Sequence, residues 1–181
     1  TSNVRFGVNA GNSIASGGNY NVTVGDEAGT AITTGDNNTA VGYNTGAAVT
    51  TGTRNTFMGS NAGDAVTEGI QNVAIGREAL GADTKGSNTV AIGNGALRAQ
   101  NFTSATDVYN TAVGDQAGTA VTTGVRNTLI GGLSGVAMTT GDRNVAVGAT
   151  SLDACTEGQY NVAVGNDALT TLTTGDRNTA V

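Results

Sequence analysis

Residues 38–54 read NTAVGYNTGAAVTTGTR, and residues 55–71 repeat the pattern as NTFMGSNAGDAVTEGIQ. Each stretch opens on Asn, places a Gly four residues later, and carries Ala-Val-Thr before a second Gly. A fixed period of seventeen residues is typical of a repeat architecture, in which one small unit stacks on copies of itself. The motif Asn-x-x-x-Gly marks the repeats at Asn21, Asn38, Asn55, Asn72, Asn110, Asn127, Asn144 and Asn161.

The length of the unit selects the fold class. It is too short for the helix-containing repeats of the ankyrin or tetratricopeptide type. Its segments between glycines are rich in β-branched residues, which favour strands, and glycine accepts the positive φ that a sharp corner demands. We therefore predict an all-β fold, a single parallel β-solenoid (β-roll) domain over residues 1–181 with about ten coils and two short strands per coil. Coils stacked about 4.8 Å apart would give a rod on the order of 45–50 Å long.

Identical positions of successive repeats lie above one another in a stacked solenoid. The Asn column is therefore predicted to form a ladder of side-chain amides that bond from one coil to the next. Thr89 stands in this column and interrupts the ladder once. A Thr column before the second Gly is equally regular, and beside it Glu68 and Lys85 fall on adjacent coils, where they can pair.

The first strand of each repeat is apolar on both faces. Its last residue is Val, Ile or Met and the residue before it is mostly Ala, although successive strand residues point to opposite faces. Since a strand that is apolar on both sides is usually buried on both, we expect sister chains to pack laterally on the outer face. The alternative is that the Ala column tolerates water. The candidate inter-chain packing column is Val24, Val41, Met58, Ile75, Ile92, Val113, Ile130, Val147 and Val164.

Residues 96–109 break the period by four extra residues. Insertions in a solenoid bulge outward as loops, often on the binding face. Arg98, Phe102 and Tyr109 lie close together in this sequence and form the candidate surface-contact loop. The alternative is a tolerated insertion that binds nothing.

Composition argues against an enzyme and against several classes of partner. The chain has no His, so Ser-His-Asp triads, Cys-His pairs and His-ligated metals are excluded, and we predict no cofactor and no metal. A net charge of −6 disfavours nucleic acid, and no apolar run is long enough for membrane insertion. Cys155 stands in an apolar column and is expected to be buried. No polar cap is apparent at either end, which suggests a segment of a longer fibre or end-to-end stacking.

The repeats at residues 38–46, 55–63 and 72–80 resemble those of bacteriophage tail-fibre proteins that often precede a self-cleaving chaperone domain. They are also similar to the head repeats of trimeric autotransporter adhesins. That resemblance implies a left-handed parallel β-roll in which three chains pack together as a homotrimer. The coils here are longer than those of the adhesin heads, which favours the tail-fibre form.

The resemblance implies a structural protein of a virion tail fibre that attaches to a host surface, with a glycan or protein receptor. A bacterial surface adhesin or extracellular filament subunit is the alternative, with an extracellular or cell-surface location. A third hypothesis is an ice-binding solenoid that uses the Thr column. It is disfavoured because Glu68, Lys85 and Glu157 interrupt the neighbouring column.

Overall fold

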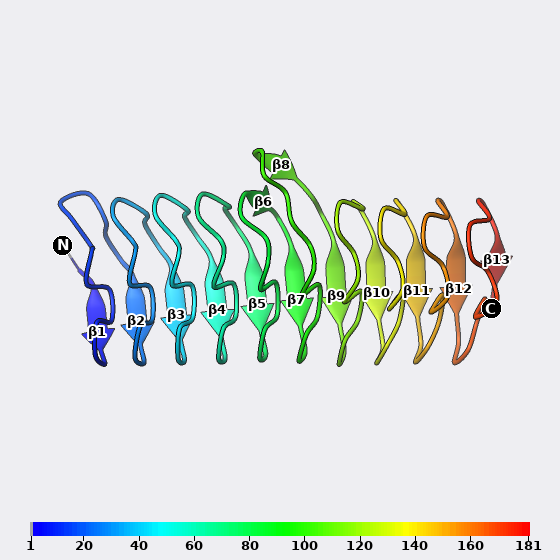
Figure 1. Cartoon of the computed structure of the whole chain (residues 1–181), viewed down its shortest axis with the longest axis horizontal. Coiled ribbons are helices and arrows are strands. Elements are labelled where there is room, and N and C mark those ends of the chain that lie inside the picture. The colour runs from blue at the N-terminus through cyan, green and yellow to red at the C-terminus, as the bar shows by residue number, and fades with distance from the viewer. Residues whose placement is uncertain (1) are drawn as a thin grey trace.

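The computed structural model describes residues 2–181 as an elongated all-β solenoid without helices. Figure 1 shows one strand of every coil aligned beside the strands of the neighbouring coils along the length of the rod. The predicted all-β parallel solenoid of about ten coils is therefore confirmed. The strands are β1 (Val4–Phe6), β2 (Val22–Val24), β3 (Thr39–Val41), β4 (Thr56–Met58), β5 (Val73–Ile75), β6 (Gly86–Ser87), β7 (Val90–Ile92), β8 (Thr106–Asp107), β9 (Thr111–Val113), β10 (Thr128–Ile130), β11 (Val145–Val147), β12 (Val162–Val164) and β13 (Thr179–Ala180).

All strands except β6 and β8 belong to one parallel sheet of 11 strands, arranged in chain order. Most neighbours pair 17 residues apart, as Ala40 does with Phe57. The step lengthens to 18 between β1 and β2 and to 21 between β7 and β9, where Val90 pairs with Thr111. The loops take up the additional residues, so the stack of strands continues past them.

Only one side of the coil is a sheet, so the prediction of two strands per coil is wrong over most of the rod. On the other side, turns stack through isolated hydrogen bonds, for example from the backbone N–H of Thr33 to the carbonyl of Thr50 at 3.0 Å. The Thr33 hydroxyl donates to the same carbonyl at 3.1 Å. The Thr column thus directs hydroxyl donors back into the rod, which leaves fewer of them for an ice-like surface. The short pair β6–β8 is the one place in residues 2–181 where strands form on this side.

The two glycine columns serve different purposes. Gly42 has a φ of 137°, as expected for a corner glycine, and a Cβ there would lie 2.8 Å from the carbonyl oxygen of Gly59. Gly52 has no positive φ, but a Cβ there would lie 2.6 Å from the carbonyl oxygen of Gly69 in the next coil. Positive φ near this second corner falls to Arg54, at 59°. The prediction that glycines supply it at both corners is therefore wrong for the second, where close backbone stacking excludes a side chain.

The interior is thin and filled mainly by small and medium apolar side chains. The middle residue of most strands points inward, as Ala74 and Ala91 do with no exposed surface. The opposite wall is the apolar column that contains Val66 and, as expected, Cys155. The alternative that the Ala column faces water is therefore wrong, because these methyl groups form one wall of the core.

The predicted Asn ladder lies inside the rod, where each member is at most 2% exposed. Asn38 Nδ2 donates to the carbonyl oxygen of Gly52 at 2.8 Å, and its Oδ1 accepts the backbone N–H of Asn55 at 3.0 Å. A side-chain bond from Asn55 Nδ2 to the same Oδ1, at 3.1 Å, joins these two rungs directly. The amides thus bond mainly to backbone groups at the corner, and their satisfied polar atoms stabilise the spacing of the coils.

Candidate functional site

The outer surface of the main sheet is a continuous uncharged stripe, which we call the strand face. It is formed by the first and third residues of β2–β5, β7 and β9–β12, while the second residue points inward. The first residue is Val or Thr throughout. The third-residue column comprises the candidate packing residues Val24, Val41, Met58, Ile75, Ile92, Val113, Ile130, Val147 and Val164, which are half-buried or exposed in the single chain.

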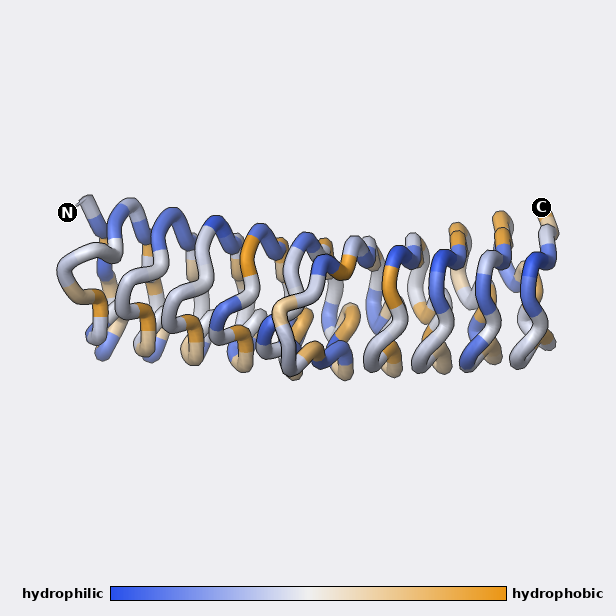
Figure 2. Tube along the Cα trace, turned by 90° about the horizontal axis from the view of Figure 1, so that it is seen from above, coloured by the Kyte–Doolittle hydropathy of each residue, from blue (hydrophilic) through white to orange (hydrophobic). Residues whose placement is uncertain are grey.

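The strand face is largely apolar and partly exposed in the single chain. Met58, Ile130 and Val164 are 44%, 38% and 36% exposed, although Met, Ile and Val are among the residues most often buried. Figure 2 shows that hydrophobic segments return at the same place in successive coils and so run along the rod. Aligned apolar side chains of this kind differ from scattered surface residues, because together they form one contiguous patch.

The insertion bulges from the rod at β8, which rises above the neighbouring coils in Figure 1. The three residues predicted to form a contact there differ in exposure and in their partners. Arg98 is exposed and its guanidinium lies 3.4 Å from a carboxylate oxygen of Glu78. Tyr109 is 52% exposed at a corner of the coil. Phe102 is only 9% exposed, so its expected place on the surface is wrong: its backbone is hydrogen-bonded to buried Asp83.

A buried polar network closes the coil beneath this insertion. Gln100 Nε2 donates to Asp83 Oδ2 at 2.6 Å and to the Thr89 hydroxyl at 3.2 Å, and its Oε1 accepts from Asn110 Nδ2 at 2.8 Å. The second Asp83 oxygen accepts the backbone N–H groups of Gly86 and Phe102, each at 3.0 Å. Gln100 thus fills the gap that Thr89 leaves in the Asn ladder.

The sequence does indicate this network, through two polar residues in an otherwise apolar column. Asp83 and Gln100 occupy two successive positions of the column that elsewhere carries Val49, Val66 and Val121 in the core. Two polar residues in an apolar buried column require partners, because an unpaired buried polar group is costly. Here the partners include the backbone N–H of Phe102, within the insertion.

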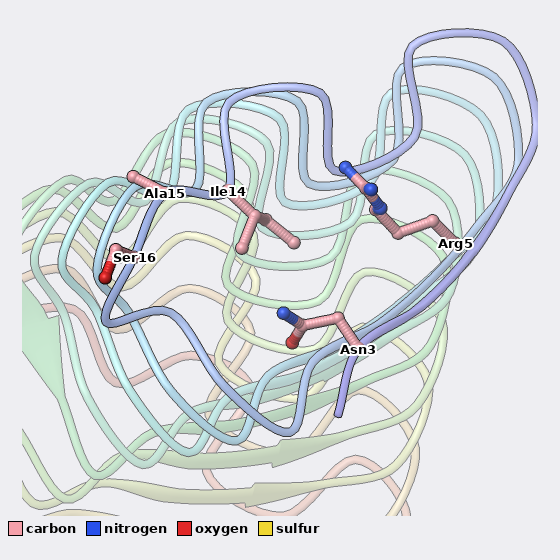
Figure 3. A pocket seen from close by; sticks show the side chains of 5 residues that line it. All are labelled: Asn3, Arg5, Ile14, Ala15 and Ser16. Carbon is pink, nitrogen blue, oxygen red and sulfur yellow. The ribbon is translucent and has the colours of Figure 1, made fainter. Parts of the chain in front are cut away.

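The first coil leaves a hollow of about 360 Å³ at the N-terminal end of the rod (Figure 3). Asn3, Arg5 and Ile14 line it, with Ala15 and Ser16 on the opposite rim. Arg5 stands in the strand position that is Ala in most coils, and its guanidinium donates to the carbonyl of Gly11 at 3.1 Å. The Arg5 guanidinium therefore lies beside the open interior of the first coil.

Chemically reactive groups are sparse in the described part of the chain. Residues 2–181 contain no group of three or more His, Cys, Asp or Glu side chains placed to hold a metal ion, and no helix that could cross a membrane. Burial raises the pKa of the Cys155 thiol, so the thiolate form is disfavoured.

Comparison with known proteins gives no relative. No protein-family model, no curated protein and no solved structure matches this chain. The functional argument accordingly depends on the repeat and on the surfaces that the rod presents.

Proposed function

We propose that this chain is a structural segment of a fibre, most consistent with the shaft of a phage tail fibre that takes part in attachment to a host surface. The observation that carries the proposal is the uncharged, apolar strand face, which runs along the rod from β2 to β12. A single narrow solenoid buries only the inward face of its strands. A second copy offers the covering surface that matches this stripe along its whole length.

The lateral partner is proposed to be the chain itself, as a homotrimer of left-handed solenoids. Removing apolar surface from water contributes about 25 cal/mol per Å², and repetition along the rod adds these contributions in register. The resemblance of the repeats to tail-fibre and trimeric adhesin repeats supports both the three-fold number and the handedness. No charged residue in β2–β5, β7 or β9–β12 would have to be desolvated on the shared face.

Such a rod would serve attachment through stiffness and multivalency. The continuous parallel sheet links every coil to the next, and the buried Asn column reinforces it on both sides of Thr89, so the rod resists bending. Three parallel chains would present three copies of any weak surface site, which raises the effective affinity for a repetitive receptor. A bacterial surface adhesin or extracellular filament would use the same physics, and a membrane anchor in the longer gene product would favour it.

The oligomeric mass tests the proposal directly. At micromolar concentration, light scattering should give three times the chain mass of 17.7 kDa. Val147→Asp places a charge on the strand face and should shift the mass towards the monomer or prevent folding, since an unpaired buried charge costs several kcal/mol. Thr140→Glu is the matched control, because Glu68 and Glu157 already occupy the same outward column.

Two results would count against this function. One is a wild-type monomer at micromolar concentration, which would show that the strand face stays exposed to water without a covering chain. The other is a folded Val147→Asp variant that retains the wild-type oligomeric mass, which would remove this face from the interface.

A further inference from the structure

A row of arginine and tyrosine side chains runs along one outer corner of the C-terminal half of the rod. The row occupies the position just before the Asn column on five successive coils. Every member is exposed and adopts a left-handed backbone conformation, with φ between 57° and 59°. The members of this arginine row are Tyr109, Arg126, Arg143, Tyr160 and Arg177.

The arginines of the row are held by stacking on the tyrosines. The guanidinium carbon of Arg126 lies 5.9 Å from the ring centroid of Tyr109. Arg143 and Arg177 lie 5.3 Å and 5.2 Å from the centroid of Tyr160. A guanidinium that stacks on an aromatic ring keeps its N–H donors free to meet a planar anion. The row is therefore pre-organised along the rod.

These guanidinium groups lack strong anionic partners within the described chain. None of the three donates a hydrogen bond to residues 2–181, and their closest ion pair joins Arg143 Nη1 to Asp142 Oδ2 at 3.9 Å. The neighbouring carboxylates serve the backbone instead. Asp142 accepts the N–H of Val125 and Asp176 accepts the N–H of Gln159, each at 2.8 Å. The row thus retains unused donors beside carboxylates that are already bonded.

The charge of the row also departs from that of the chain. The protein carries a net charge of −6, yet the column from Tyr20 to Arg177 contains Arg54 and the three row arginines, four of the eight cations, and no Asp or Glu. Arg126 and Arg143 stand on adjacent coils, about 4.8 Å apart along the axis. Two like charges at that spacing repel, and an anion placed between them would relieve the repulsion.

We propose that the arginine row binds a linear anionic polysaccharide that lies along the rod. Carboxylate and sulfate groups match the two-pronged donor geometry of arginine, and a straight row of donors fits a polymer whose charges recur along its length. A nucleic acid calls for a broader basic groove and free aromatic faces on which bases can stack. The row is one residue wide, and its two tyrosine rings already stack on arginines. The inference names the receptor class for the attachment role and so rests on the proposed function.

The test compares two triple variants of the full chain that change the net charge equally. Arg126→Gln/Arg143→Gln/Arg177→Gln removes the row, and Arg77→Gln/Lys85→Gln/Arg98→Gln removes three cations elsewhere. Binding of polygalacturonate and dextran sulfate is measured by titration calorimetry at about 50 mM and about 300 mM salt. The row variant should lose affinity about tenfold or more, because charge-assisted bonds are removed, while the control variant should remain close to wild type. Added salt should weaken wild-type binding.

The outcomes separate this inference from the proposed function. Equal losses in both variants, absence of wild-type binding, or equal binding of neutral dextran would overturn the row as a polysaccharide site. If single-stranded DNA binds as tightly as the polysaccharides, the assignment of a polysaccharide ligand is wrong. The oligomeric mass is measured on the same samples: a trimer that does not bind refutes the row alone, and a monomer that binds refutes the lateral packing alone.

Discussion

The ring of Phe57 fills the space that a side chain at Gly63 would occupy. A Cβ at Gly63 would lie 2.7 Å from two atoms of the ring, and one at Gly46 in the preceding coil would lie 2.8 Å from it. Where the middle strand residue is Ala74, the equivalent of Gly63 is the buried Leu80. A large strand residue with glycines around it and a small one with leucine are therefore two ways to fill the same core volume.

We expect Phe57 and Gly63 to be strongly coupled in stability. Phe57→Ala should cost about 3–5 kcal/mol, because it leaves a cavity in a thin core. Gly63→Leu alone should also destabilise the fold relative to the wild type, because the new side chain clashes with the Phe57 ring. The double variant reproduces the pair at Ala74 and Leu80 and should recover more than half of the loss. Urea denaturation of all four proteins measures the coupling, and purely additive effects would contradict it.

The buried amide of Gln100 should matter more than the exposed tip of its loop. Gln100→Ala leaves the Asp83 carboxylate and the Asn110 amide each short of a partner, which should cost about 1–3 kcal/mol. Ser104→Ala, at the exposed tip, should change stability by less than about 0.5 kcal/mol. Denaturation and the rate of proteolytic cleavage within residues 96–109 give the two readouts. Equal effects of the two substitutions would show that the network does not anchor the insertion.

Asp64 should make stability depend on pH. Burial raises the pKa of its carboxyl above 3.8, the charge of Glu78 adds to this, and the backbone N–H groups of Asp64 and Ala65 oppose it. A raised folded-state pKa means that the group favours folding below its unfolded pKa and loses that contribution as pH rises through the folded pKa. Asp64→Asn should therefore raise the thermal midpoint at pH 7, and the gain should shrink near pH 3.

The matched control for this substitution is Glu157→Gln, on an exposed carboxylate. It removes the same negative charge from the chain, and its thermal midpoint is measured at the same two pH values. A gain at Asp64→Asn that persists unchanged at low pH would mean that the effect does not come from ionisation.

Cys155 should be chemically silent in the folded rod. Its side chain is fully buried, and burial raises the pKa of the thiol, so both access and thiolate formation are suppressed. A thiol reagent at pH 8 should therefore react only after denaturant is added. Cys155→Val should cost less than about 1.5 kcal/mol, because it nearly conserves volume in an apolar column. Rapid labelling of the native protein would contradict this burial.

The period predicted the sheet well because every coil repeats the same backbone. Asn38, Gly42 and Gly52 recur at fixed spacing, and this spacing alone places the strand and both corners. The pairing of Phe57 with Gly63 was not predicted, because it depends on volume shared between coils rather than on either column. Arg54 could not be assigned its left-handed conformation either, since an exposed corner residue needs only a compatible backbone and not a particular side chain.

The insertion shows the limit of reading exposure from sequence. Arg98, Phe102 and Tyr109 lie close together in the chain, but a coil directs successive residues to different sides. Phe102 therefore turns inward, and Tyr109 joins the arginine row on another corner. The arginine row could not be predicted from the repeat, because its column mixes Tyr, Arg, Asn and Gln and has no single repeated residue.

The sealed insertion suggests a practical use for this scaffold. Gln100 and Asp83 close the interior below it, and β9 resumes the sheet beside β7 as though nothing had been added. Foreign peptides grafted between Thr103 and Ala105 would extend from one coil only. The axial spacing of the neighbouring coils would stay unchanged. The rod would thus display an inserted peptide while its length and straightness stay the same.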